Sequence, residues 1–112
     1  MAFDVSELAA TRVALDDFCS RHSQPAGQVR FGYEIDCHSV VLSEMRPDSR
    51  DLATWDCEPF AKFRFYRSRG EWLLYWVRSD GKWHRYEPAA PARRLSTLVG
   101  HVDRDTYGCF LG

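Results

Sequence analysis

Residues 60–88 interleave aromatic side chains with arginine and lysine, the combination that proteins use to bind nucleic acid. Aromatic rings stack on unpaired bases, and cationic side chains meet the phosphates between those bases. Two turn signals divide the segment. Ser68-Arg69-Gly70 fits a three-residue loop with glycine in the left-handed position, and Asp80-Gly81 is the favoured dipeptide of a two-residue hairpin turn. The segment is therefore predicted to form a three-stranded meander.

These turn lengths fix a register that places Phe65 opposite Leu73 and Trp76 opposite Arg85. Because side chains alternate between the two faces of a strand, each face can be written out. The predicted core face carries Ala61, Phe63, Phe65, Leu73, Tyr75, Val77, His84 and Tyr86. The predicted basic-aromatic face carries Lys62, Arg64, Tyr66, Trp72, Leu74, Trp76, Arg78, Trp83 and Arg85.

The basic-aromatic face is the primary site hypothesis, and it implies a non-enzymatic binding module. The residues predicted to contact nucleic acid or another polyanion are Lys62, Arg64, Trp72, Trp76, Arg78, Trp83 and Arg85. The alternative is that helices cover both faces of the sheet, so that the indoles are core and the arginine heads reach the rim. Charge distribution favours a binding face: residues 1–59 hold 5 basic and 11 acidic groups, whereas residues 60–87 hold 7 and 3.

A second hypothesis from another functional class is a protein-interaction or adaptor module. Residues 46–59 are predicted to be irregular, and long irregular segments in small domains are often functional. Their acidic side chains and single tryptophan form the alternative contact surface, since aromatic anchors dominate protein interfaces. This surface comprises Asp48, Asp51, Trp55, Asp56 and Glu58. A solvated excursion held to the body by Trp55 is the simpler interpretation.

A third hypothesis is a thiol or metal-dependent enzyme around Cys109, with His101 eight residues earlier as a base. A buried, inert cysteine explains the same residue types. Cys19 and His22 have one C-x-x-H spacing, but zinc sites normally show two paired ligand motifs. The sequence therefore predicts no metal site, no cofactor and no catalytic residue.

The remaining elements complete an α+β fold in a single domain, residues 1–112. Asp4 and Glu7 form a capping box for a helix from Asp4 to His22, whose apolar stripe is expected on the sheet. Alternating residues predict strands at Val29–Ile35 and Ser39–Met45. After a proline-rich connector, helical spacing predicts a short helix at residues 95–102, and the final segment is expected to pack down. The fold is thus an N-terminal helix, a five-stranded antiparallel meander and a short C-terminal helix.

A cytoplasmic location is predicted, because the sequence shows no recognisable secretion or membrane signal. The N-terminus lacks the basic flank and apolar core of a signal peptide, and no apolar run approaches the ~18 residues of a membrane span. Without a secretory signal, the four cysteines are expected to be reduced thiols. No membrane partner is expected, and the oligomeric state is open.

Several short motifs resemble a known family. They are Lys62-Phe63-Arg64, Gly70, Trp72, Leu74-Tyr75-Trp76, Asp80-Gly81-Lys82-Trp83-His84, Tyr86, Pro88, Gly108-Cys109-Phe110 and Gly112. Together they resemble a family of short bacterial proteins catalogued as domain of unknown function 3024, and Leu111 departs from the aromatic residue expected there. The resemblance implies a bacterial cytosolic protein and brings no catalytic residue, cofactor or partner.

Overall fold

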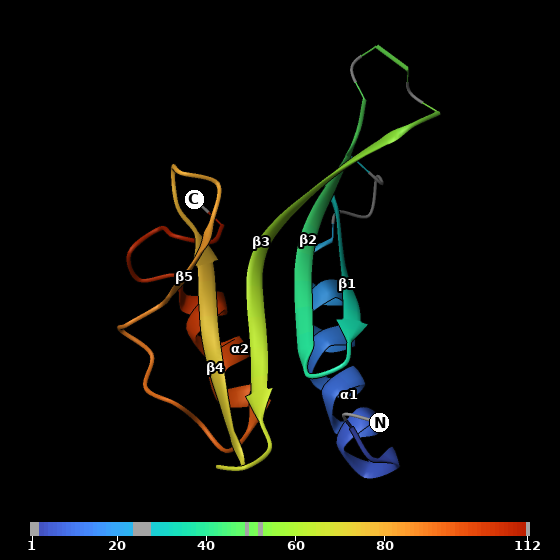
Figure 1. Cartoon of the computed structure of the whole chain (residues 1–112). Helices are drawn as coiled ribbons and strands as arrows, with labels where there is room; N and C mark the ends of the chain where they lie inside the picture. Colours follow the sequence, from blue (N-terminus) through green and yellow to red (C-terminus); the bar gives the residue numbers. More distant parts are fainter. Residues whose placement is uncertain (1–2, 24–27, 49, 52, 112) are drawn as a thin grey trace.

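The protein folds as an N-terminal helix, a five-stranded antiparallel sheet and a short C-terminal helix, as the sequence predicts (Figure 1). The computed structural model describes residues 3–23, 28–48, 50–51 and 53–111. The elements are α1 (Val5–His22), β1 (Arg30–Asp36), β2 (Ser39–Pro47), β3 (Trp55–Tyr66), β4 (Glu71–Val77), β5 (Trp83–Arg85) and α2 (Leu95–Arg104). The strands lie in sequence order, β1-β2-β3-β4-β5, so the sheet is a simple meander.

The predicted capping box begins α1. The Asp4 carboxylate accepts a hydrogen bond from the Glu7 amide at 2.7 Å, and the Glu7 carboxylate accepts one from the Asp4 amide at 3.0 Å. Both are backbone donors that an uncapped helix would leave without partners. The predicted stripe also faces the core, with Thr11, Leu15 and Phe18 buried.

The β2–β3 ribbon corrects the prediction that residues 46–59 are irregular. Strand β2 continues to Pro47 and β3 begins at Trp55, so these two residues pair across the ribbon. The chain reverses at residues 48–54, where the Asp48 amide donates to the Thr54 carbonyl at 2.9 Å. The ribbon extends beyond the rest of the sheet as an arm (Figure 1). The prediction failed because residues 46–47 and 55–59 of these strands are mostly polar and exposed, so this end of the ribbon has no buried face to produce apolar alternation.

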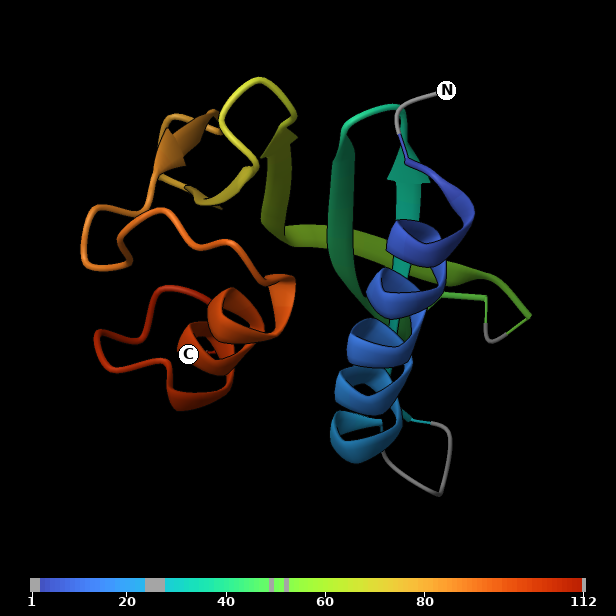
Figure 2. The same ribbon diagram turned by 90° about the horizontal axis from the view of Figure 1, so that it is seen from below.

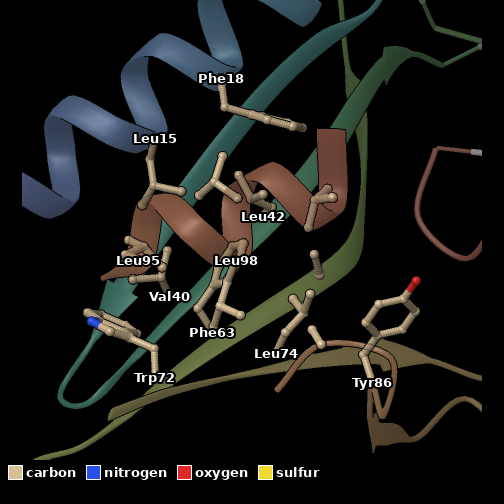
Figure 3. Close-up of a cluster of buried hydrophobic side chains, with 14 of the residues drawn as sticks. Leu15, Phe18, Val40, Leu42, Phe63, Trp72, Leu74, Tyr86, Leu95 and Leu98 are labelled. Carbon is tan, nitrogen blue, oxygen red and sulfur yellow. The ribbon is translucent and has the colours of Figure 1, made fainter. Parts of the chain in front are cut away.

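Both helices lie on the same face of the sheet. Figure 2 shows α1 against the β1–β2 half and α2 against the β3–β4 half, with the tail after α2 on the same side. Figure 3 shows Leu15 and Phe18 from α1 and Leu95 and Leu98 from α2 directed toward the strands. These side chains form one core cluster with Val40, Leu42, Phe63, Leu74 and Tyr86 from the sheet and the adjoining segment. The two-layer arrangement therefore leaves one sheet face uncovered by helices.

Polar contacts fasten the helical layer. Asp103 of α2 accepts hydrogen bonds from the Arg21 guanidinium at 2.9 and 3.2 Å, and lies 2.6 Å from His22 Nε2. The C-terminal tail returns to the core, since Phe110 is buried and its ring centroid lies 4.9 Å from that of Tyr86. The tail therefore packs as predicted through Leu111, while Gly112 lies outside the described residues. Within the described residues, no helix is both long enough and apolar enough to cross a membrane.

Candidate nucleic-acid interface

The sheet face opposite the helices carries a mixed aromatic, aliphatic and basic surface, here called the open sheet face. Alternation along β2–β5, with Val40, Phe63 and Leu74 fixed in the core, decides which side chains lie on it. They include Val41, Lys62, Arg64, Tyr66, Glu71, Leu73, Tyr75, Val77, Trp83 and Arg85. None of them belongs to the core cluster.

The β3–β4 turn is one residue longer than the sequence analysis predicted. Tyr66 pairs with Glu71, so the loop contains four residues, 67–70, and Phe65 faces Trp72 instead of Leu73. Gly70 still takes the left-handed conformation expected of it, with φ of 62°. Because the side-chain period is two, this single residue turns the whole of β4 over.

The β4–β5 turn is also one residue longer than predicted. Val77 pairs with Trp83, and the Arg78 amide donates to the Lys82 carbonyl at 3.2 Å. This leaves a three-residue loop, Ser79-Asp80-Gly81, which ends in a glycine with φ of 76°. This is the three-residue hairpin in which a type I turn is followed by a left-handed residue. The two errors cancel for β5, whose Trp83 and Arg85 lie on the predicted face. Only β4 is inverted.

The predicted contact surface is therefore divided between the two faces. Lys62, Arg64, Trp83 and Arg85 lie together on the open sheet face, as the sequence indicates. The predicted placement of Trp72, Trp76 and Arg78 is wrong. These residues alternate in step with the buried Leu74 and so lie on the face that the helices cover.

Trp72, Trp76 and Arg78 make contacts on the helix side of the sheet. Trp72 is 6% exposed and stacks on Phe3, with ring centroids 5.5 Å apart. Trp76 packs against the core, and the guanidinium of Arg78 lies 5.6 Å from its ring centroid. Two of the tryptophans that were predicted to bind nucleic acid, Trp72 and Trp76, therefore pack on the helix side of the sheet.

Strand β4 contributes Leu73, Tyr75 and Val77 to the open sheet face in place of the tryptophans. Leu73 is buried although it is outside the core cluster and faces Arg64 across the strands. Long neighbouring side chains on this face, and not a helix, must cover it. Tyr75 was predicted on the core face because the β3–β4 turn was predicted one residue too short.

Two tyrosines on adjacent strands join their hydroxyls on the open sheet face. Tyr66 and Tyr75 are 2.8 Å apart between oxygens. Guanidiniums flank the first ring, with Arg64 at 5.3 Å and Arg69 at 4.7 Å from the Tyr66 centroid. Burial, followed by the hydrogen bond to Tyr66, raises the pKa of Tyr75 to about 12. The Tyr75 hydroxyl therefore stays neutral at physiological pH and can donate or accept a hydrogen bond.

Among the described side chains, three cations of this face are not engaged in ion pairs, although Glu71 lies on the same face. Arg85 lies opposite Tyr75, and its Nη2 donates to the Ala89 carbonyl at 3.4 Å. In the part of the chain that the structure describes, no carboxylate forms an ion pair with Lys62, Arg64 or Arg85. A hollow of about 260 Å³ lies beside Lys62 and Arg64, and its other wall is the end of β1 at Asp36 with the turn at Cys37 and His38. The face thus combines half-buried rings with positive charge available to an anion.

The alternative acidic surface lies on the β2–β3 arm. Asp48 and Asp51 are engaged in the turn, accepting the amides of Arg50 at 2.7 Å and Ala53 at 3.1 Å. The other two acidic residues of the predicted surface, Asp56 and Glu58, are exposed on β3. Trp55 does not hold an irregular loop to the body; the Arg30 guanidinium lies 4.6 Å from its ring centroid.

The surroundings of Cys19 and Cys109 do not favour a reactive thiolate. Burial and then the nearby Asp105 carboxylate raise the pKa of Cys109, and burial raises that of Cys19 to about 11. A nucleophilic cysteine needs the opposite shift. Burial lowers the pKa of His101, and no hydrogen bond joins it to Cys109. Among the described side chains, no three His, Cys, Asp or Glu residues are grouped as a metal site would require.

The family resemblance is confirmed along the chain. The family model described as "Domain of unknown function (DUF3024)" matches residues 3–112. The chain belongs to this family. No curated protein matches the chain, and no solved structure matches it. The matched region spans every helix and strand of the DUF3024 fold described above, including the open sheet face.

Proposed function

We propose that this DUF3024 protein is a non-enzymatic module that binds single-stranded nucleic acid on its open sheet face. The observation that carries the proposal is the placement of both helices on one side of the sheet (Figure 2). That placement leaves Tyr66, Tyr75 and Trp83 on the other side, among cations that form no ion pair within the described part of the chain.

The chemistry of this face suits unpaired bases. A base stacked on an aromatic side chain contributes about 1–3 kcal/mol, and any base offers a ring face for this contact. Lys62, Arg64 and Arg85 lie within the same patch and can meet phosphates along the strand. A duplex hides its base faces within the stack, so single strands are the favoured ligand.

Fluorescence anisotropy of a labelled 12-nucleotide oligo(U) tests the proposal. The double variant Lys62→Ala/Arg64→Ala removes two phosphate contacts and should weaken binding about tenfold at low salt. It should also reduce the slope of log K against log salt by about 1.4, since single strands release roughly 0.7 counterion per phosphate contact. The matched control is Arg12→Ala/Arg104→Ala, which removes two exposed charges from the helical layer.

Equal losses in the two double variants would mean that net charge, and not this face, determines binding. An affinity that does not change between about 50 and 200 mM salt would contradict the phosphate contacts altogether.

A second candidate function, protein–protein interaction, is favoured by the projection of the β2–β3 arm from the sheet (Figure 1). The exposed carboxylates of Asp56 and Glu58 and the half-buried Trp55 would form the contact. A Trp55→Ala variant should then lose capture of a protein partner while binding oligo(U) as the unsubstituted protein does. Parallel loss of both activities would argue against an arm interface separate from the open sheet face.

A further inference from the structure

The helical layer borders a cavity that is partly open to solvent and separate from the open sheet face. Its volume is about 580 Å³, and it lies between α1, the chain just before α2, and the end of the β3–β4 hairpin. Small-molecule sites in proteins commonly have about 300–1,000 Å³. Figure 3 shows Trp72, which lines this cavity, at one end of the buried cluster. The cavity is thus large enough for a ligand and borders the core.

Three aromatic rings form the apolar wall of the cavity. The ring centroid of Trp72 lies 5.5 Å from that of Phe3 and 5.1 Å from that of Phe65. All three side chains are at least 90% buried. Ala10 and Ala14 of α1 add small apolar surface to the lining. An apolar body entering here would leave water for an aromatic and aliphatic surface.

The charged groups at the rim are unequal. The negative charge of Glu7 is paired, because Arg67 donates a hydrogen bond to its carboxylate at 2.8 Å. This hydrogen bond is the largest cause of the lowered pKa of Glu7. Arg93 and Arg94 line the same cavity from its other edge and are exposed. Within the described part of the chain, neither arginine forms an ion pair or a side-chain hydrogen bond. The net charge offered to a ligand is therefore positive.

We propose that this cavity binds a small amphipathic anion, with its apolar body against the Phe3, Phe65 and Trp72 rings and its acidic head at Arg93 and Arg94. Charge complementarity selects an anion, because the only acidic side chain lining the cavity among the described residues is already paired. The aromatic wall selects an apolar body over a free inorganic anion. This site is on the helix side of the sheet, so it does not depend on the proposed nucleic-acid function.

Octanoate and its neutral analogue 1-octanol are the probes, used in ¹H–¹⁵N titrations of the whole protein. The four tryptophan indole signals, assigned from single Trp→Phe variants, report separately on the cavity and on the open face. Octanoate should shift the Trp72 indole signal and leave that of Trp83 in place. Arg93→Gln/Arg94→Gln should weaken octanoate binding about tenfold while changing octanol binding less than about twofold.

Two controls make the result decisive. Arg50→Gln/Arg104→Gln removes two exposed charges away from the cavity and should bind octanoate normally. Ala10→Phe fills the cavity from an exposed helix position and should abolish binding of both probes. A Trp72 signal that neither probe shifts would overturn the proposal. So would equal affinity for octanoate and octanol, since the arginines would then have no role in recognition.

Discussion

Both faces of β4 carry apolar side chains, but the surroundings of the two faces differ. On the helix side, Trp72, Leu74 and Trp76 contact the core cluster, and Leu74 is fully buried. On the other side, Leu73, Tyr75 and Val77 lie among Lys62, Arg64 and Arg85 with no helix over them. An aromatic strand therefore does not by itself mark a core or a binding surface; the layer packed against it decides.

The largest expected effect is a difference in the free energy of unfolding between substitutions on the two faces of β4. Leu74→Ala should lower the free energy of unfolding by about 3 kcal/mol, because it opens a cavity in the packed core. Leu73→Ala removes the same atoms from the open sheet face, where flanking side chains can close over the site, and should cost about 1 kcal/mol. Urea unfolding measures both values. Equal losses would mean that the open face is packed as tightly as the core.

A smaller effect concerns the polar contacts that hold the helices together. Burial alone would raise the pKa of Asp103, but hydrogen bonds from Arg21 and His22 outweigh it and hold this pKa below its usual range. The stabilisation is therefore present above the unfolded pKa of about 4 and is lost as pH falls through the lowered folded value.

Asp103→Asn should accordingly cost about 1 kcal/mol at pH 7 and flatten the loss of stability between about pH 5 and pH 2. Urea unfolding across this range measures the change. The matched control is Asp17→Asn, which removes a more exposed partner of Arg21 and should change the profile little. If the stability of Asp103→Asn falls with pH as steeply as that of the unsubstituted protein, the Asp103 contacts do not cause the acid sensitivity.

The smallest effect sharpens the description of the open sheet face. The pKa of Tyr75, raised to about 12, should be visible as a late tyrosine transition in a pH titration followed by ¹³C NMR of the ring. Tyr66→Phe removes the hydroxyl partner and should lower this pKa, with burial maintaining the rest of the shift. No change in Tyr66→Phe would show that the 2.8 Å contact does not govern Tyr75.

Local signals in the sequence predicted most of the fold. The Asp4–Glu7 capping box, the stripe of α1 and the helical spacing of α2 are all confirmed. Each depends on residues within a few positions of one another, which is where propensity and periodicity are informative.

Longer-range consequences were less predictable. One additional residue in each hairpin loop of the meander inverted β4 alone, because register depends on loop length and not on the composition of the strand. The placement of both helices on one face arises from tertiary packing, since the pattern of each helix shows only that it has an apolar side. Tyr75 could be assigned to the open sheet face only once these two features were known.

The most direct test of the central claim is an oligo(U) titration followed by the four tryptophan indole signals. Binding on the open sheet face should shift the Trp83 signal and leave that of Trp72 unchanged, since Trp72 is 6% exposed beneath the helical layer. Lys62→Ala/Arg64→Ala should reduce the Trp83 shift at a fixed oligonucleotide concentration. Absence of any shift at Trp83, or a shift confined to Trp72 and Trp76, would contradict nucleic-acid binding at this face.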